Sequence, residues 1–258
     1  MGERVNLIGG RPLYNRAMNL RTLLPALLLP AILAACQTTA PQPAGTDAGA
    51  ALPELRAAYA ALAARGAVYA VDPSASKVRV YVFRAGAAAR LGHNHVLSAT
   101  HFEGYVSVPT EQAADAGFEL RVPLADLGVD DAEARRETGG SFIGERSAGD
   151  IAGTRTNMLG DRGLQAGRFP LVRLRSAAIE GDWPVLIAQV EVTLHGVTRT
   201  QPVVLLVERS AALLKVSGTL LLRQSDFGVT PFSALGGLMK VQDPVAIAFE
   251  LSAVPARL

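Results

Sequence analysis

The chain of 258 residues contains one cysteine, Cys36, and only 5% aromatic residues. A single cysteine excludes an internal disulfide, so stability has to come from a buried core, and a chain of this length can form one. Strong charge is also absent: the formal net charge is +2. Residues before Cys36 hold four of the 25 basic residues and one of the 23 acidic residues, so the remainder carries −1. A basic surface for nucleic acid is therefore not expected.

Signatures of catalysis are also missing. The sequence has neither a phosphate-binding loop nor a dinucleotide fingerprint. The segment from Gly139 to Ile143 is not a nucleophile elbow, because its fifth residue is not glycine. No enzyme activity and no cofactor are expected. A binding function is favoured, because it needs no catalytic motif.

The N-terminal segment reads as an export signal. An apolar run from Leu23 to Leu33 follows Arg21; it is too short to span a bilayer and contains two prolines. It ends in Leu-Ala-Ala-Cys, which resembles the lipobox of bacterial lipoproteins, where the signal is removed and the cysteine is acylated. We expect residues 1–35 to be a signal peptide, translation to begin at Met18, and Cys36 to be a lipid anchor. The alternative is an ordinary signal beside an unrelated cysteine.

Residues 36–66 are expected to connect the anchor to a folded domain. The part from Gln37 to Ala51 is rich in Thr, Pro, Ala and Gly, which is typical of a flexible tether. Leu52 to Arg65 follows with helical start and stop signals and a thin apolar face of Leu55, Tyr59 and Leu62. This pattern favours a spacer helix that leans on the domain. The residue after the cysteine is Gln37 and not the aspartate associated with inner-membrane retention. The periplasmic face of the outer membrane is therefore the expected location.

From Tyr69 onward, alternation of apolar and polar residues predicts about eight strands joined by short turns. The expected fold class is all-β with one or two short helices, an antiparallel eight-stranded barrel. Residues 131–162 form the one long polar interruption, and a short helix is expected within 146–159. Residues 67–258 are predicted to form this domain.

Val190 to Val207 predicts a hairpin: period-two alternation reaches His195, Gly196 permits positive φ, and a second apolar run returns. Its string T-L-H-G-V-T-R resembles the signature of the YceI-like family of secreted, lipocalin-like barrels. Three further segments match in order: Y-A-V-D-P at Tyr69, L-Q-A-G-R-F-P at Leu164, and D-F-G-V at Asp226. The resemblance implies an eight-stranded, lipocalin-like barrel that binds polyisoprenoid lipid, such as a quinone or polyprenyl chain.

Such a ligand would lie against the apolar faces of the strands. The candidate lining residues are Val80, Val82, Leu120, Val122, Leu174, Val190, Val192, Leu205, Leu220, Ile247 and Phe249. The same residues would fill an ordinary packed core, so a packed barrel stays an alternative. Arg155 and Asn157 in the polar interruption are candidates for contacts to a ligand headgroup, because long loops on rigid barrels often carry function.

A second hypothesis concerns histidines. His93 and His95 share a strand face, and His101 can return from the next strand, so three imidazoles could meet at a metal. Glu103 is the nearby carboxylate. The family resemblance links some relatives to b-type cytochromes, which makes a metal- or haem-linked redox protein with a membrane cytochrome partner the alternative function. For these histidines a structural or headgroup role is favoured, and for His195 a turn-fixing hydrogen bond.

Overall fold

The computed structural model describes residues 48–258. The expected signal peptide, Cys36 and most of the tether lie outside the described residues and stay predictions. The helix expected over Leu52 to Arg65 is α1, Ala48–Leu62, followed by a 3-10 turn η1, Ala63–Arg65. No helix in the described part is both long and apolar enough to cross a membrane.

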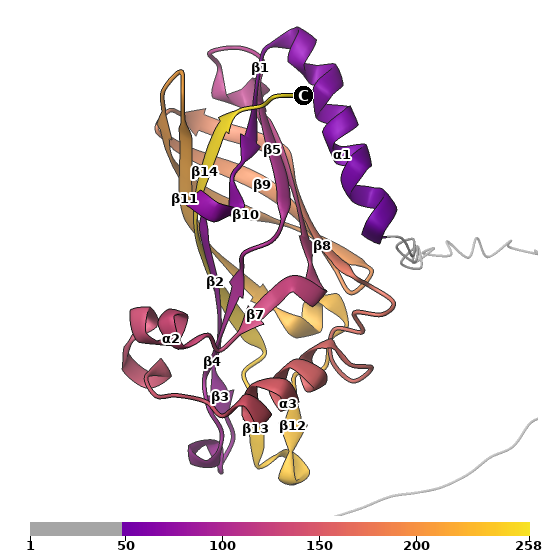
Figure 1. The fold of residues 1–258 in the computed structure, drawn as a ribbon, viewed down its shortest axis with the longest axis vertical. Coiled ribbons are helices and arrows are strands. Elements are labelled where there is room, and N and C mark those ends of the chain that lie inside the picture. Colours follow the sequence, from indigo (N-terminus) through magenta and orange to yellow (C-terminus); the bar gives the residue numbers. More distant parts are fainter. Residues whose placement is uncertain (1–47) are drawn as a thin grey trace, which may run out of the picture. The chain divides into compact units, whose positions relative to one another are not determined.

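An antiparallel sheet closes on itself as an eight-stranded barrel, which confirms the predicted fold class (Figure 1). Closure occurs where Tyr69–Val71 pairs with Ala253–Pro255. In order around the wall, the strands are β1 (Ala67–Val71), β5 (Glu103–Val108), β6 (Gly117–Pro123), β8 (Leu171–Asp182), β9 (Val185–Leu194), β10 (Val197–Arg209), β11 (Leu214–Arg223) and β14 (Pro244–Pro255).

Three more strands extend the sheet at one end of the barrel. They are β2 (Lys77–Val82), β4 (His95–Ala99) and β7 (Leu127–Val129), and β2 pairs with the first half of β14. A separate small sheet of β12 (Ser233–Ala234), β13 (Met239–Val241) and β3 (Arg84–Ala85) projects from the same end (Figure 1). These strands are too short to show alternation, so the sequence pattern does not predict this small sheet.

Two wall strands run beyond their ladder partners on one side. β10 pairs with β11 only over Leu205–Arg209, and the neighbouring stretch of β10 contains Pro202, which has no N–H to donate. β8 pairs with β6 only over Leu171–Arg175. The 3-10 turn η7, Gln224–Phe227, contacts β10, and η4, Ala113–Asp115, contacts β8.

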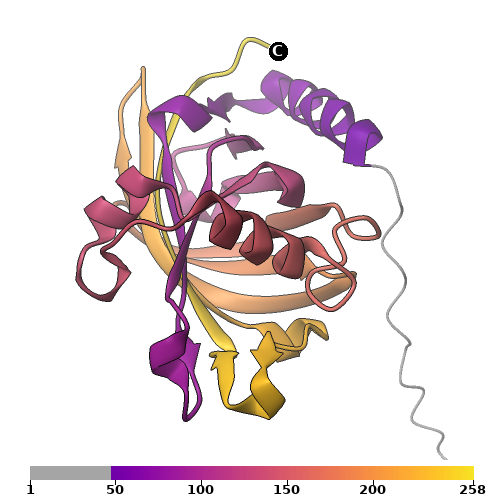
Figure 2. The same ribbon diagram turned by 60° about the horizontal axis from the view of Figure 1, so that its bottom comes forward.

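The helices lie on the outside and across one end of the barrel. α1 packs on the wall through Leu55 and Tyr59, whose ring stacks on Tyr105 at 5.3 Å, as expected for a spacer helix. The polar interruption contains two helices: α2, Ala132–Thr138, which sequence analysis missed, and α3, Ala148–Leu159. Ser147 begins α3 with a capping box to Asp150. Figure 2 shows α3 crossing the end of the barrel.

Candidate functional site

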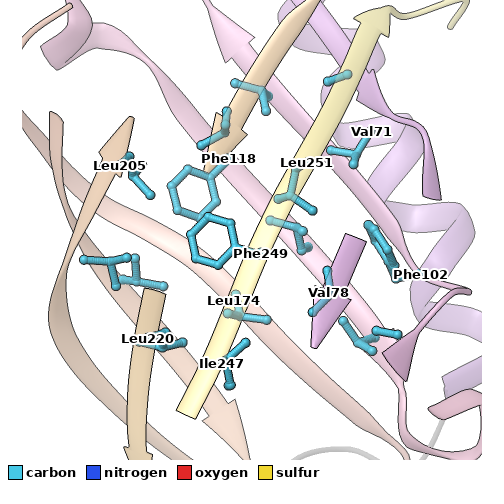
Figure 3. A pocket seen from close by; sticks show the side chains of 18 of the residues that line it. Val71, Val78, Phe102, Phe118, Leu174, Leu205, Leu220, Ile247, Phe249 and Leu251 are labelled. Carbon is cyan, nitrogen blue, oxygen red and sulfur yellow. The ribbon is translucent and has the colours of Figure 1, made fainter. Parts of the chain in front are cut away.

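The inward faces of the barrel strands surround an apolar cavity of about 200 Å³. Alternation places these side chains inside, because every second residue of a strand faces the same way. Phe118 and Phe249 project into the interior from β6 and β14 (Figure 3). Every side chain that lines the cavity is apolar, apart from the indole N–H of Trp183, and that group donates to the carbonyl of Glu111 at 2.9 Å.

Most of the lining residues expected from the sequence lie at the cavity. These are Val80, Leu120, Val122, Leu174, Val190, Val192, Leu205, Leu220, Ile247 and Phe249. Val82 does not line it, because this residue pairs with His95 and lies beyond the part of β2 that faces the cavity. Ligand binding by the ten residues stays a prediction, but their convergence on one space is a property of the fold.

Arg155 and Asn157 do not line the cavity. The guanidinium of Arg155 donates to the carbonyl oxygens of Leu127, at 2.7 Å, and Ala125, so it ties α3 to the connection after β6. Asn157 is exposed on α3. We therefore do not assign headgroup contacts to either residue.

Sequence analysis missed several lining aromatic residues, including Phe102, Phe118 and Trp183. Phe118 alternates in phase with Leu120 and Val122, so the pattern already contained it. Phe102 precedes its strand and Trp183 lies in the turn after β8, where alternation gives no information.

The hairpin between β9 and β10 helps to close one end of the barrel. His195 and Gly196 form its two-residue turn with φ of 53° and 76°, the combination of a type I′ turn. The Nδ1 of His195 lies 3.1 Å from the carbonyl oxygen of Phe227, and its ring meets Phe169 edge-on at 4.8 Å. The expected turn-fixing hydrogen bond of His195 is confirmed, and it joins two of the segments that carry the family resemblance.

The other end is closed by Trp183 and its neighbours. The guanidinium of Arg209 lies 4.9 Å from the centre of the Trp183 ring, and Arg209 also pairs with Glu111. This salt bridge places polar side chains at that end of the barrel.

The three clustered histidines do not form a metal site. Within residues 48–258 no group of three or more His, Cys, Asp or Glu side chains is arranged to hold a metal ion, which corrects the three-imidazole hypothesis. His101 is exposed and hydrogen-bonds with Thr100 at 3.1 Å, whereas His95 Nδ1 donates to Asp130 at 2.6 Å. Tertiary contacts separate residues that sequence spacing appeared to bring together.

His95 belongs to a buried polar network. Asp130 and Arg135, each 2% exposed, form a salt bridge of 2.5 Å, and Asp130 also accepts from the backbone N–H of Val96. Arg135 donates to the carbonyl oxygens of Asn94 and Gly144 at 3.0 and 2.9 Å. This network fixes α2 against β4 and β7, so its role is structural.

The network sets the charge state of Asp130. Burial opposes ionisation of this carboxyl, but hydrogen bonds from His95, Val96 and Arg135 outweigh burial and hold its pKa below the ordinary value. Asp130 is therefore ionised at neutral pH and pairs with a buried cation. The pKa of the neighbouring His93 is lowered, first by burial and then by the positive charge of Arg146.

Comparisons with known proteins agree with this architecture. No curated protein matches the chain significantly. The structure of BcnA from Burkholderia cenocepacia is 18% identical with a TM-score of 0.53, and the match covers 71% of this chain and 99% of that one. This likeness shows the fold. A polyisoprenoid binding domain from Saccharophagus degradans is 15% identical with a TM-score of 0.48, covering 73% and 98% of the two chains.

A YceI protein from Campylobacter jejuni is 11% identical with a TM-score of 0.46, covering 62% of this chain and 85% of that one. Residues 69–253 match the model of the YceI-like domain, a range that begins within β1 and ends within β14. The chain belongs to the YceI-like domain family.

Proposed function

We propose that this protein is an envelope lipoprotein whose barrel binds an apolar isoprenoid-type lipid, a quinone or polyprenyl chain, for carriage or storage. The observation that carries the proposal is the cavity of about 200 Å³ with its apolar lining. Burial of hydrocarbon contributes about 25 cal/mol per Å² and needs no polar partner. Membership of the YceI-like family supports the same ligand class, through the polyisoprenoid binding that the resemblance implies.

The lining chemistry limits how such a ligand is held. A buried polar headgroup costs free energy unless it is hydrogen-bonded, and the lining side chains offer it no free partner. The hydrocarbon chain therefore belongs inside the barrel and the headgroup at an end. The redox alternative has no comparable support, because His95 is engaged by Asp130 and the three histidines do not converge.

Native mass spectrometry with organic extraction and metal analysis tests the ligand proposal. All contacts of the barrel and α1 described above lie within residues 48–258, so a soluble form that begins at Gln37 retains them. A co-purifying isoprenoid at near-unit stoichiometry is the expected result. A bound metal without lipid, or neither, would contradict the proposal.

A pair of variants on one strand locates the ligand. Val192→Asp places a carboxylate in the cavity and is expected to abolish lipid binding or folding. Ile187→Asp is the matched control, because Ile187 lies on the outer face of β9 and is 41% exposed. Lipid retained by a folded Val192→Asp protein, or lost equally from both variants, would refute the assigned inward face.

The anchor is tested separately. Metabolic labelling with a fatty acid should modify the exported chain, and Cys36→Ser should remove the label. Fractionation of the envelope should place the labelled protein with the outer membrane. Label that persists in Cys36→Ser would contradict the lipoprotein proposal without affecting the barrel's ligand.

A further inference from the structure

The small sheet at one end of the barrel exposes large apolar side chains. Leu91, Leu235 and Leu238 are 61%, 60% and 53% exposed, and Phe232 is 41% exposed. We call the segments Arg84–Gly92 and Phe232–Val241 the apolar tip. They form one unit: β13 pairs with β3 and β12, and the N–H of Ala88 donates to the carbonyl oxygen of Leu238 at 2.8 Å. Figures 1 and 2 show this unit projecting away from the barrel.

The backbone presents one of these leucines in an unfavourable conformation. Leu235 has φ of 52°, in the left-handed region, which side chains other than Gly and Asn rarely adopt. Gly236 and Gly237 follow with φ of 65° and 92° and complete the turn. Leu235 is still 60% exposed in this conformation, which points to a contact outside the chain.

The charges of the tip have one sign. Arg84, Arg90 and Lys240 are exposed, and neither segment of the tip contains an aspartate or glutamate. None of the three forms a salt bridge within the described part of the chain. Exposed leucines and phenylalanine among unpaired cations match the acyl chains and anionic headgroups of a lipid surface.

We propose that the apolar tip docks on a bilayer leaflet containing anionic phospholipid, with its four apolar side chains inserted at the headgroup boundary. The single sign of the charges around these apolar side chains favours an anionic bilayer as the occupant. This site is independent of the lipid proposed for the cavity. Docking would place one end of the barrel at the membrane.

Vesicle flotation tests the proposal with the form that begins at Gln37, which carries no acyl anchor. Vesicles of phosphatidylcholine with phosphatidylglycerol should bind the protein, and vesicles of phosphatidylcholine alone should bind it weakly. Leu235→Asn with Leu238→Gln should weaken binding by about tenfold for each leucine removed. Asn suits the left-handed position, so the variant should fold normally. Arg90→Gln with Lys240→Gln should reduce binding and its sensitivity to salt.

The matched control removes apolar surface elsewhere. Val204→Thr with Leu221→Thr changes side chains that are 59% and 61% exposed on the barrel wall, and it should leave vesicle binding unchanged. Equal losses in control and tip variants, or no loss in either, would overturn the proposal. So would equal binding to both kinds of vesicle.

Fluorescence provides the orientation. Trp183 lies at the opposite end of the barrel, since β8 ends and β9 begins there, and brominated lipid should leave its emission unchanged. Phe232→Trp adds an indole to the tip whose emission the same lipid should quench. Quenching of Trp183 without quenching at position 232 would show that another face docks and would overturn the assignment.

Discussion

Filling the cavity distinguishes an enclosed binding space from a packed core, and Val122→Phe is the informative change. Val122 lines the cavity opposite Val172 on the neighbouring strand. Phenylalanine adds about four carbon atoms, each worth about 0.8 kcal/mol when buried, so the free energy of unfolding of lipid-free protein should rise by up to ~3 kcal/mol. In a dense core the same change would lower it by about 1–3 kcal/mol through overpacking. The two interiors therefore predict opposite signs.

The assay is urea unfolding of protein freed of lipid by extraction, followed by far-UV ellipticity, with native mass spectrometry of unextracted protein. The expected result is a stable variant that has lost its lipid. Val96→Phe is the matched control: Val96 is 0% exposed and packs with Ala134 and Phe142 outside the cavity, so it should be destabilised and keep its lipid. If Val122→Phe behaves like Val96→Phe, the barrel interior is packed and the reasoning fails.

Three further predictions concern the described fold. Asp130→Asn leaves the charge of Arg135 buried without its counter-ion, so urea unfolding should show a loss of about 3–5 kcal/mol, against less than about 1 kcal/mol for the surface change Glu191→Gln. The pKa of Asp130 in the folded state lies below its unfolded value of about 3.9, so its contribution to the free energy of unfolding is complete above that pH and is lost as the pH falls through the folded pKa. The difference in the free energy of unfolding between the unmodified protein and Asp130→Asn should therefore narrow in acid. A difference that widens in acid would contradict this sign. Gly196→Ala should cost more than about 1 kcal/mol, since φ is 76° and its Cβ would lie 2.6 Å from an aromatic carbon, whereas Gly236→Ala, with φ of 65° in open space, should cost less; equal losses would show that backbone strain alone decides.

Local sequence patterns were sufficient for the wall of the barrel. Alternation from Val190 to His195, with Gly196 as turn residue, predicted the β9–β10 hairpin, and Leu55 and Tyr59 predicted the buried face of α1. These features depend on side chains close in sequence, which share one strand face or one helix face. An antiparallel barrel is one way for such strands to bury their apolar faces, and its closure between β1 and β14 is seen in the structure.

Tertiary contacts decided what the sequence left open. Asp130 and Arg135 look like solvated loop charges in the sequence, yet they form the buried pair that engages His95, and this removes the three-histidine arrangement. Alternation is identical for a hollow and a filled barrel, because it reports which way a side chain points and not what lies opposite. The cavity could therefore be identified only from the structure.

The incomplete ladders on β8 and β10 have a consequence for the motions of the barrel. Val197–Val204 of β10 and Ala177–Asp182 of β8 lie toward opposite ends, and each runs beyond its pairing with the neighbouring wall strand. Opening there breaks contacts with short 3-10 turns and leaves the ladders intact. The backbone N–H groups on the unpaired side of these two stretches should exchange with deuterium earlier than the N–H groups of the β8–β9 and β11–β14 ladders. Each end of the barrel can therefore open without unfolding the other.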